Sequence, residues 1–399
     1  MLNNIYETRE KYSKSENFID LISTDLSKIY SYPVDKLNSY IKKYIDNRVY
    51  EPDSKGILKA RLAISNYENS KLEGCKIEAE NIFITASTSE SYNLIFQTLT
   101  KSNNTKEKYE VLLPNPSYPL FEELTKYSNL DAKYYNQVRD NNWEVDLESI
   151  IKNITCKTKF IVLISPNNPT GNVINNEVFK KICSIANRNK IVIIIDEVFN
   201  EFTYENEITW DMSGIVKFED LIIFKLNGIS KMFALPDFKL AWIEIYGEST
   251  KKEELIEELE ISNDMFLSAN SISQNILPDL FNDIDCMKDL KNKLKTNFKI
   301  INDKLSKQSD FEYILPKAGI HLILTTKKEY SVVGKSLEEI EEIFVSKLIE
   351  KEEVFIHPGF FYDYHDQKRL SFVMSIANDT IKLTKGLDRL FKFLTTFHG

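Results

Sequence analysis

The chain of 399 residues contains few cysteines and few arginines, and both shortages narrow the possible functions. Cys75, Cys156, Cys183 and Cys286 are far apart and show no paired spacing, which fits neither a disulfide framework nor a zinc site. We therefore expect free, buried thiols in a reducing compartment and no bound metal. Only seven of the 51 basic residues are arginine. Asn and Ile are also abundant, which indicates a genome-wide preference for Lys. A Lys in place of an expected Arg is therefore weak evidence of altered chemistry.

The chain also lacks a run of apolar residues long enough to cross a membrane, and its first ten residues lack the apolar core of a secretion signal. Its net charge of -9 and its pI near 5.3 argue against nucleic-acid binding, since phosphate backbones are held by clustered cations. No internal repeat or low-complexity linker is visible. We expect a cytoplasmic protein that binds neither membrane nor nucleic acid.

The sequence does contain many apolar residues, arranged in short runs. They make up 42% of the chain, which is enough to bury a large core. The runs are mostly unalternating, as in strands that are covered on both faces of a parallel or mixed sheet. They comprise residues 81–85, 111–113, 160–164, 191–195, 221–224 and 241–245. Helical spacing occurs between them, at residues 90–99 and 177–186.

This alternation of strands and helices predicts an α/β fold with two domains. We expect a large layered domain over residues 46–284. A charged helix over residues 290–305 and the elements after it would form a smaller, discontinuous α+β domain, made of residues 1–45 and 285–399.

One lysine has a position that suits reaction rather than solvation. Lys231 follows the apolar run Leu221–Phe224, and a short strand there would fix the lysine in a turn. Such an amine can form a Schiff base with an aldehyde cofactor if its surroundings prevent permanent protonation. Most lysines are instead solvated surface residues. The prediction for Lys231 therefore depends on other segments of the chain.

Polar residues follow two other predicted strands. Asp196 comes directly after Ile191–Ile195, and Ser165–Gly171 follows Phe160–Ile164. Ligands bind at the carboxyl ends of such strands, because loops and helix N-termini gather there. Asp196 would also serve as a helix cap, and Pro, Asn and Gly are ordinary turn residues. The alternative is that Asp196 pairs with the ring nitrogen of a pyridine cofactor.

Three motifs in order resemble the signature of the fold-type I pyridoxal phosphate enzymes, specifically the class I/II aminotransferases. They are Asn168-Pro169-Thr170-Gly171, Asp196-Glu197-Val198-Phe199, and Ser230-Lys231 followed by Leu235-Pro236 and Lys239. The resemblance covers about residues 50 to 369 and is strongest to bacterial alanine/aspartate-type aminotransferases. It implies an aspartate aminotransferase-like fold, in which the large domain has a mostly parallel seven-stranded sheet between helices.

The resemblance also implies roles for single residues. Lys231 would form the internal aldimine with pyridoxal 5′-phosphate and then move the proton at the substrate α-carbon. Asp196 would pair with the pyridine nitrogen, and Tyr118 would stack on the ring. Asn168 would bind the phenolic oxygen of the cofactor and contact the substrate. Phe199 stands where the family usually has a Tyr that donates to that oxygen.

The phosphate end of the cofactor would lie at a helix start, where backbone N–H groups meet the anion. The residues implied there are Ser87, Thr88, Ser89, Ser230 and Lys239. Ser or Thr alone would more simply be a helix cap. Lys239 acts as a point charge where an Arg would make a fork. Gly228 stands where a phosphate-binding Ser is common.

Two more implied roles concern a partner and the substrate. Tyr50 would reach the cofactor phosphate of the neighbouring subunit, which implies a homodimer. Arg369 would clamp the substrate α-carboxylate, because a guanidinium binds a carboxylate through two hydrogen bonds. Counting back from Gly386 instead places Val373 at that position, and Arg369 would then be a surface residue.

The activity implied is transfer of an amino group between an amino acid and a 2-oxo acid. A lyase or cyclase of the same fold would start from the same carbanion, so only the pocket separates these outcomes. A binding or regulatory protein that keeps the site without turnover is a third possibility, and fold alone does not decide among them. Intact Lys231 and Asp196 argue against the third. The motifs do not name the amino donor, the acceptor or the pathway.

Overall fold

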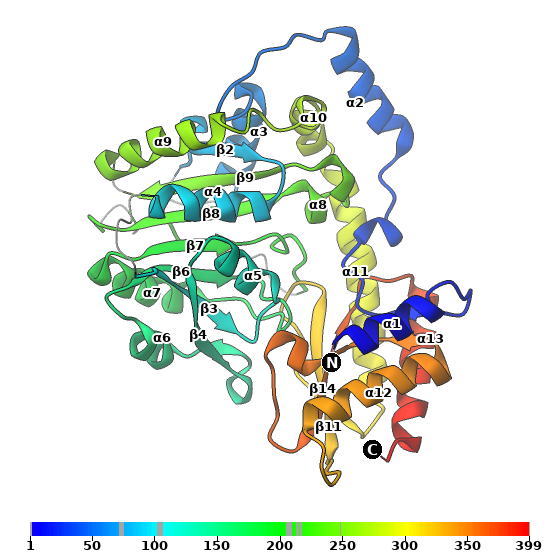
Figure 1. Ribbon diagram of the computed structural model, residues 1–399. Coiled ribbons are helices and arrows are strands. Elements are labelled where there is room, and N and C mark those ends of the chain that lie inside the picture. Colours follow the sequence, from blue (N-terminus) through cyan, green and yellow to red (C-terminus); the bar gives the residue numbers. More distant parts are fainter. Residues whose placement is uncertain are drawn as a thin grey trace.

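The computed structural model describes residues 2–71, 76–101, 107–204, 210–212, 215, 218–247 and 249–398. The chain forms two lobes, each built on its own sheet (Figure 1). Cys75 lies outside the described residues, whereas Cys183 and Cys286 are buried free thiols and Cys156 is an exposed one. Among the described helices, none has both the length and the apolar composition of a membrane span.

The larger lobe contains an eight-stranded sheet with the order β2-β9-β8-β7-β6-β3-β4-β5. Its strands are β2 (Ile82–Thr85), β3 (Glu110–Asn115), β4 (Asp131–Val138), β5 (Glu144–Val145), β6 (Thr158–Ile164), β7 (Val192–Asp196), β8 (Ile222–Gly228) and β9 (Ala241–Gly247). Strands β8, β7, β6, β3 and β4 run parallel to one another. Strand β9 is antiparallel to both of its neighbours, β8 and β2, and the two-residue β5 is antiparallel to β4. The predicted mostly parallel sheet is confirmed, with β5 as a short additional edge strand.

Both faces of this sheet are buried, which explains the unalternating apolar runs. In β7, Ile193 and Ile195 belong to one core and Val192 and Ile194 to the other, since successive side chains of a strand alternate. The helices that cover the first face are α3 (Leu58–Asn69), α6 (Leu147–Asn153), α7 (Asn176–Asn189) and α10 (Ser271–Asn282). Those that cover the second are α4 (Thr88–Thr100), α5 (Leu120–Tyr127) and α9 (Ser249–Asp264).

The smaller lobe contains a four-stranded antiparallel sheet with the order β10-β11-β14-β13. Its strands are β10 (Phe311–Tyr313), β11 (His321–Glu329), β13 (His357–Pro358) and β14 (Arg369–Ser375), and a separate parallel pair is formed by β1 (Ile19–Asp20) and β12 (Val354–Phe355). The helices around them are α1 (Leu2–Tyr12), α12 (Leu337–Glu352) and α13 (Thr380–Thr396). The predicted smaller α+β domain is therefore present. Its boundaries, 1–45 and 285–399 against 46–284, stay a prediction.

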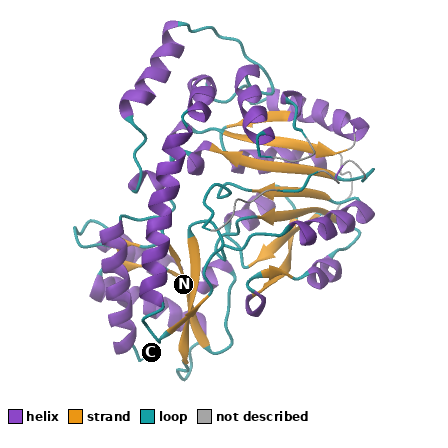
Figure 2. Ribbon diagram, turned by 180° about the vertical axis from the view of Figure 1, so that it is seen from behind, coloured by secondary structure: helices purple, strands orange, loops and turns teal. Residues whose placement is uncertain are grey.

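Two helices extend beyond the lobes. Helix α11 (Ile284–Leu305) runs alongside both of them, as the view from behind shows (Figure 2). Helix α2 (Val34–Asp46) stands away from both sheets, contacts α10 and has no buried residue (Figure 1). The segments on either side of α2 connect the small lobe to α3.

Gly171 takes part in one of the contacts between the lobes. Gly171 has a φ of 66°, and a Cβ there would lie 2.1 Å from the Pro316 Cβ, so no other residue fits. The Gly171 carbonyl accepts hydrogen bonds from the N–H groups of Lys317 and Ala318. The loop that follows β6 is thereby attached to the strand that enters the small sheet.

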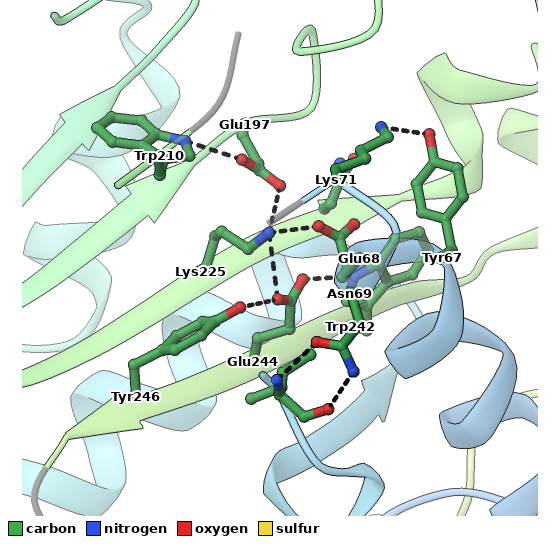
Figure 3. A network of polar contacts seen from close by, with 12 residues as sticks. Tyr67, Glu68, Asn69, Lys71, Glu197, Trp210, Lys225, Trp242, Glu244 and Tyr246 are labelled. Carbon is green, nitrogen blue, oxygen red and sulfur yellow. Dashed lines mark hydrogen bonds and ion pairs between the residues drawn. The ribbon is translucent and has the colours of Figure 1, made fainter. Parts of the chain in front are cut away.

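A cluster of charged side chains is buried on the α3 side of the large sheet (Figure 3). The Lys225 Nζ lies 2.6 Å from the Glu68 carboxylate, 2.9 Å from Glu197 and 3.1 Å from Glu244. Each of these four side chains is at most 4% exposed. The three carboxylates have the spacing of a metal site, with oxygens within 4.8 Å of one another, and the ammonium group takes the central place.

Protons on the carboxyl groups set the charge of this cluster. Burial raises the pKa of Glu197 to about 7 and that of Glu244 to about 8, although Lys225 lowers both. Burial alone would lower the pKa of Lys225, but the three carboxylates raise it well above its usual value. The lysine therefore stays a cation, while Glu197 and Glu244 hold protons at a pH where exposed carboxyl groups are ionised.

We expect the free energy of unfolding to fall as the pH rises from 4.5 to about 8. Glu197 and Glu244 have raised pKa values in the folded protein, so their contribution is complete below 4.5, their ordinary value, and is lost as the pH rises through about 7 and 8. Urea unfolding across this range measures the slope. In the double variant Glu197→Gln with Glu244→Gln the fall should be smaller. Part of it should remain, because burial also raises the pKa of Asp196 to about 6 and that of Glu341 to about 8. A slope that persists unchanged would refute the assignment.

Candidate active site

A cavity of about 320 Å³ lies where strands β6, β7 and β8 end. This is the expected place for a ligand in an α/β sheet. Most of the residues predicted from the sequence line it: Ser87, Thr88, Ser89, Tyr118, Asn168, Asp196, Phe199, Ser230, Lys231 and Lys239. Segments separated by more than a hundred residues in sequence are thus brought together in one cavity.

Lys231 lies in α8 (Ile229–Met232), a single helical turn that follows β8 directly. The strand is longer than the predicted run 221–224, so it carries the lysine to the edge of the sheet. The Lys231 Nζ donates a hydrogen bond to the Thr24 carbonyl at 2.8 Å. Burial lowers the pKa of Lys231, and Asp25 opposes this in part. A larger neutral fraction of the amine is what a nucleophilic lysine requires.

Asp196, the last residue of β7, is 3% exposed. Its carboxylate accepts hydrogen bonds from the Tyr92 hydroxyl and from the Val198 N–H, each at 3.3 Å. Burial raises the pKa of Asp196 to about 6, against the lowering effect of both hydrogen bonds. At neutral pH the side chain is thus an anion in a place where a cation would stabilise it.

Asn168 contains an unsatisfied acceptor. Its side chain is buried, and its Oδ1 has no hydrogen-bond partner among the described residues. The neighbouring Asn167 side chain, by contrast, accepts from the Thr170 N–H and hydroxyl at 3.1 and 3.0 Å. An unmade hydrogen bond in such a place costs about 1–3 kcal/mol. A donor group on a bound ligand would recover that cost.

The start of α4 provides a site for an anion. The Ser87 side chain caps the helix by accepting from the Glu90 N–H at 3.1 Å, and Thr88 and Ser89 form the first turn. The dipole and free N–H groups of a helix start favour a phosphate. Ser230 and Lys239 line the same cavity and add a hydroxyl and a positive charge.

Gly228 is explained by close approach of two strands. Its backbone is extended, and a Cβ there would lie 2.8 Å from the Leu240 carbonyl oxygen and 3.1 Å from the Ala241 Cα. A Ser at this position, common in the family that the motifs resemble, would push β9 away. The absence of a serine hydroxyl at position 228 is therefore a consequence of how closely β8 and β9 pack in this chain.

The assignment of Arg369 as the substrate clamp needs correction. Arg369 begins β14, and its guanidinium lies 2.7 Å from the Glu312 carboxylate and 2.8 Å from that of Asp366. The opposite end of β14 is nearer the cavity, because Ser375 there pairs with His321, whose ring contacts that of Phe199. The strand register thus moves Arg369 away from the cavity.

Two other predicted positions also lie outside the cavity. Val373, the alternative position for the clamp, is buried in β14 opposite Ile323. Tyr50 is 71% exposed in the segment after α2. Neither side chain contributes to the cavity of its own chain, so any role of Tyr50 requires a second subunit.

Sequence reasoning missed several residues of the site. Tyr92 follows Thr88 by four residues in α4, so helical spacing could have placed its hydroxyl near Asp196. Thr24 comes from the loop after β1. No sequence feature indicated its place in the site, because its contact with Lys231 is made through a backbone carbonyl. Leu120 and Phe121, which begin α5, form an apolar part of the lining.

The residues present fit pyridoxal phosphate in each of its functional groups. The cavity offers an amine for the aldehyde, a carboxylate for the ring nitrogen, an unpaired amide oxygen for the hydroxyl group and a helix start for the phosphate. Lys231, Asp196 and Asn168 supply the first three. All of these donors and acceptors belong to a single chain, so the fit does not depend on a partner subunit.

Comparison with known proteins agrees with this fit. The model of the family aminotransferase class I and II matches residues 35–384. A tyrosine aminotransferase of Dictyostelium discoideum is 26% identical over 357 residues, which cover 86% of this chain and 80% of the relative. An S-alkyl-thiohydroximate lyase of Arabidopsis thaliana is 29% identical over 354 residues, 85% of this chain and 71% of the relative.

Among solved structures, an alanine aminotransferase from Pyrococcus furiosus superposes with a TM-score of 0.85 at 24% identity, covering 99% of this chain and 96% of the other. That likeness establishes the aspartate aminotransferase-like fold. The family match spans most of the chain and includes Asn168, Asp196 and Lys231. The chain is therefore an enzyme of the class I and II aminotransferase family.

Proposed function

We propose that this enzyme uses pyridoxal 5′-phosphate to move an amino group between an amino acid and a 2-oxo acid. The observation that carries the proposal is the meeting of the Lys231 amine, the Asp196 carboxylate and the unpaired Asn168 Oδ1 in one cavity. When bound, the cofactor would supply an aldehyde for covalent capture and a ring that accepts electrons.

The side chains of the cavity divide the remaining work. Lys231 would hold the cofactor covalently and, as a free amine, would take and return the proton at the reacting carbon. Asp196 would keep the ring nitrogen protonated, and Asn168 would orient the ring by donating or accepting at its hydroxyl group. Tyr118 and Phe121 line the same cavity, where Tyr118 would pack on the ring and Phe121 would help to exclude water.

Half-reaction spectroscopy tests the proposed activity. The protein is loaded with the cofactor, and single amino acids are added without an acceptor. A transaminase should lose its visible absorbance and release a 2-oxo acid that retains no amino group, with recovery when a second 2-oxo acid is added. Release of ammonia at each turnover, without recovery by the oxo acid, would exclude transamination.

A lyase of the same fold is the second candidate, because one of the relatives is named as an S-alkyl-thiohydroximate lyase. A lyase would use Lys231 and Asp196 in the same way and then expel a leaving group from the substrate. Cysteine S-conjugates are the decisive substrates. Release of the thiol together with ammonia and pyruvate identifies elimination, whereas a 2-oxo acid that still carries the sulfur substituent identifies transfer.

We further propose a homodimer in which Tyr50 reaches the cofactor phosphate of the partner subunit. The support is the position of Tyr50, which is exposed after the outlying helix α2, next to exposed Val49 and near exposed Ile45 in the last turn of α2. Light scattering should give twice the monomer mass. Tyr50→Phe should weaken cofactor binding about tenfold, the size of one hydrogen bond to a charged group. Unchanged affinity would remove Tyr50 from the site. A cytoplasmic location stays a prediction from composition.

Cofactor affinity should depend on pH through Asp196. Because the pKa of Asp196 is raised to about 6, the carboxyl is neutral below that value and loses its attraction for a protonated ring nitrogen. Pyridoxine 5′-phosphate, which has no aldehyde, isolates this effect from the chemistry of Lys231. Its affinity for the apoprotein should rise as the pH increases from about 5 to 7, and the rise should be smaller in Asp196→Asn. The part that remains comes from the ligand phosphate, which loses its second proton at about pH 6. A rise of equal size in that variant would remove Asp196 from the pH-dependence.

A further inference from the structure

The positions of all seven arginines bear on which substrates fit the cavity. All seven lie in the described parts of the chain, and none lines the cavity. Six bind carboxylates or backbone carbonyls elsewhere in the fold: Arg9, Arg61, Arg139, Arg188, Arg369 and Arg389. The seventh, Arg48, is exposed in the segment between α2 and α3.

The strongest of these attachments show that the guanidinium groups are not free to turn inward. Arg61 is 4% exposed and donates to the Gly56 carbonyl at 2.7 Å and to Asp53 at 2.8 Å. Arg9 lies 2.9 Å from Asp20 and packs over the Phe355 ring. Releasing either would leave a buried or partly buried acceptor without its donor.

Other cations do not replace the missing clamp. Among the described lining residues, the charged amines are those of Lys231, which the cofactor consumes, and Lys239, which serves the phosphate end. His321 and His357 are buried near the cavity, and burial lowers the pKa of each to about 3, so both are neutral. The Asp196 carboxylate adds negative charge.

Much of the remaining lining is apolar or uncharged. Leu120, Phe121, Val198 and Phe199 contribute apolar side chains, beside the neutral polar side chains of Tyr92, Tyr118 and Asn168. A carboxylate moved from water into such a lining without a charged partner loses solvation and gains little in return. A neutral or apolar group suffers no such penalty.

We propose that the amino donor of this enzyme need not carry a carboxylate on the reacting carbon, and that primary amines with apolar side chains are substrates. The proposal rests on the aminotransferase activity proposed above. In the half-reaction, the amine nitrogen passes to the cofactor aldehyde, which is reduced by two electrons to the amine form. The donor carbon is oxidised to an aldehyde whose oxygen comes from water, and Lys231 carries the proton released from that carbon.

Matched pairs of donors test the substrate class. The loaded enzyme is mixed with L-phenylalanine or 2-phenylethylamine, and separately with L-norvaline or butylamine, and the rate of absorbance loss is measured. A site built around a hydrogen-bonded substrate group rejects an analogue lacking that group by about 10⁴-fold. Here each amine should react within about tenfold of its amino acid, or faster. A preference for the amino acid beyond tenfold in both pairs overturns the proposal.

Binding without turnover provides a second readout. Calorimetry with 3-phenylpropanoate and 3-phenylpropanol should show no tighter binding of the carboxylate, and a carboxylate bound more than tenfold tighter than the alcohol would contradict the inference. Arg48→Gln is the matched variant, because Arg48 is the one arginine in the segment that carries Tyr50. In Arg48→Gln we expect the ratio of amine to amino-acid rates and the ratio of carboxylate to alcohol affinities to be unchanged. An amino-acid preference that Arg48→Gln abolishes would show that a cation arrives from a partner subunit.

The outcomes also separate this inference from the proposed function. Reaction of amino acids alone overturns the substrate class and leaves the transaminase activity standing. If neither amines nor amino acids change the absorbance of the loaded enzyme, the proposed function itself fails, and the inference fails with it.

Discussion

Lys231→Ala is expected to reduce amino transfer by at least about 10³-fold. General acid–base catalysis alone accounts for about 10²–10⁴-fold, and the variant also loses covalent attachment of the cofactor. The fold should survive, because the Lys231 amine makes one hydrogen bond, to the Thr24 carbonyl, and its loss costs about 1 kcal/mol. Single-turnover rates with the best amino donor measure the effect.

The control for this prediction is Lys152→Ala, an exposed lysine of α6. It should keep the wild-type rate and the wild-type unfolding midpoint. A Lys231→Ala protein that is folded and transfers amino groups at the wild-type rate would show that another amine does the chemistry. Rescue by an added amine that has no hydrogen on its nitrogen-bearing carbon, and so cannot itself donate an amino group, would support the role of Lys231 as proton carrier.

Lys225→Ala is expected to lower the free energy of unfolding by about 3–5 kcal/mol, the usual effect of removing one member of a buried charge cluster. The substitution leaves Glu68, Glu197 and Glu244 within a short distance of one another and without the central cation. Chemical denaturation at about pH 7 measures the loss. Raising the pH should make it larger, because the carboxyl groups then lose the protons that limit their repulsion.

A surface ion pair provides the comparison for the buried one. Lys42 pairs with Asp46 one turn along α2 and is well exposed, so Lys42→Ala should change the unfolding free energy by less than about 0.5 kcal/mol. If Lys225→Ala were equally mild, the cluster would not be held together by the ammonium group. Lys225→Ala with added divalent cation is an informative extension, since the vacated centre has carboxylate oxygens at metal-site spacing.

The sequence was sufficient to predict those parts of the fold in which local pattern and tertiary environment agree. The apolar runs became β2, β3, β6, β7, β8 and β9, because strands buried on both faces need apolar residues at every position. Strand β4 was missed: it lies next to the edge of the sheet, begins with exposed Asp131 and Lys133, and then alternates between buried positions (Tyr135, Gln137) and exposed ones (Asn136, Val138). Its polar sequence gives no apolar run.

The residues of the candidate site differ in the same way: some follow from local sequence, and others depend on tertiary structure. Asn168, Asp196 and Lys231 were identified because each lies at the carboxyl end of a strand or shortly after it and belongs to an ordered series of motifs. Arg369 was misplaced, since its position depends on the register of β14 against β11, which local sequence does not encode. Thr24 acts through its backbone carbonyl, so its side chain gave no indication of the contact.

The central claim is that pyridoxal phosphate is bound covalently at one lysine of this chain. Borohydride reduction of the loaded enzyme, followed by proteolysis and mass spectrometry, tests it most directly. The account predicts one pyridoxyl adduct, on the peptide that contains Lys231. An unmodified Lys231 peptide in protein that retains the cofactor, or an adduct at a different lysine, would contradict it.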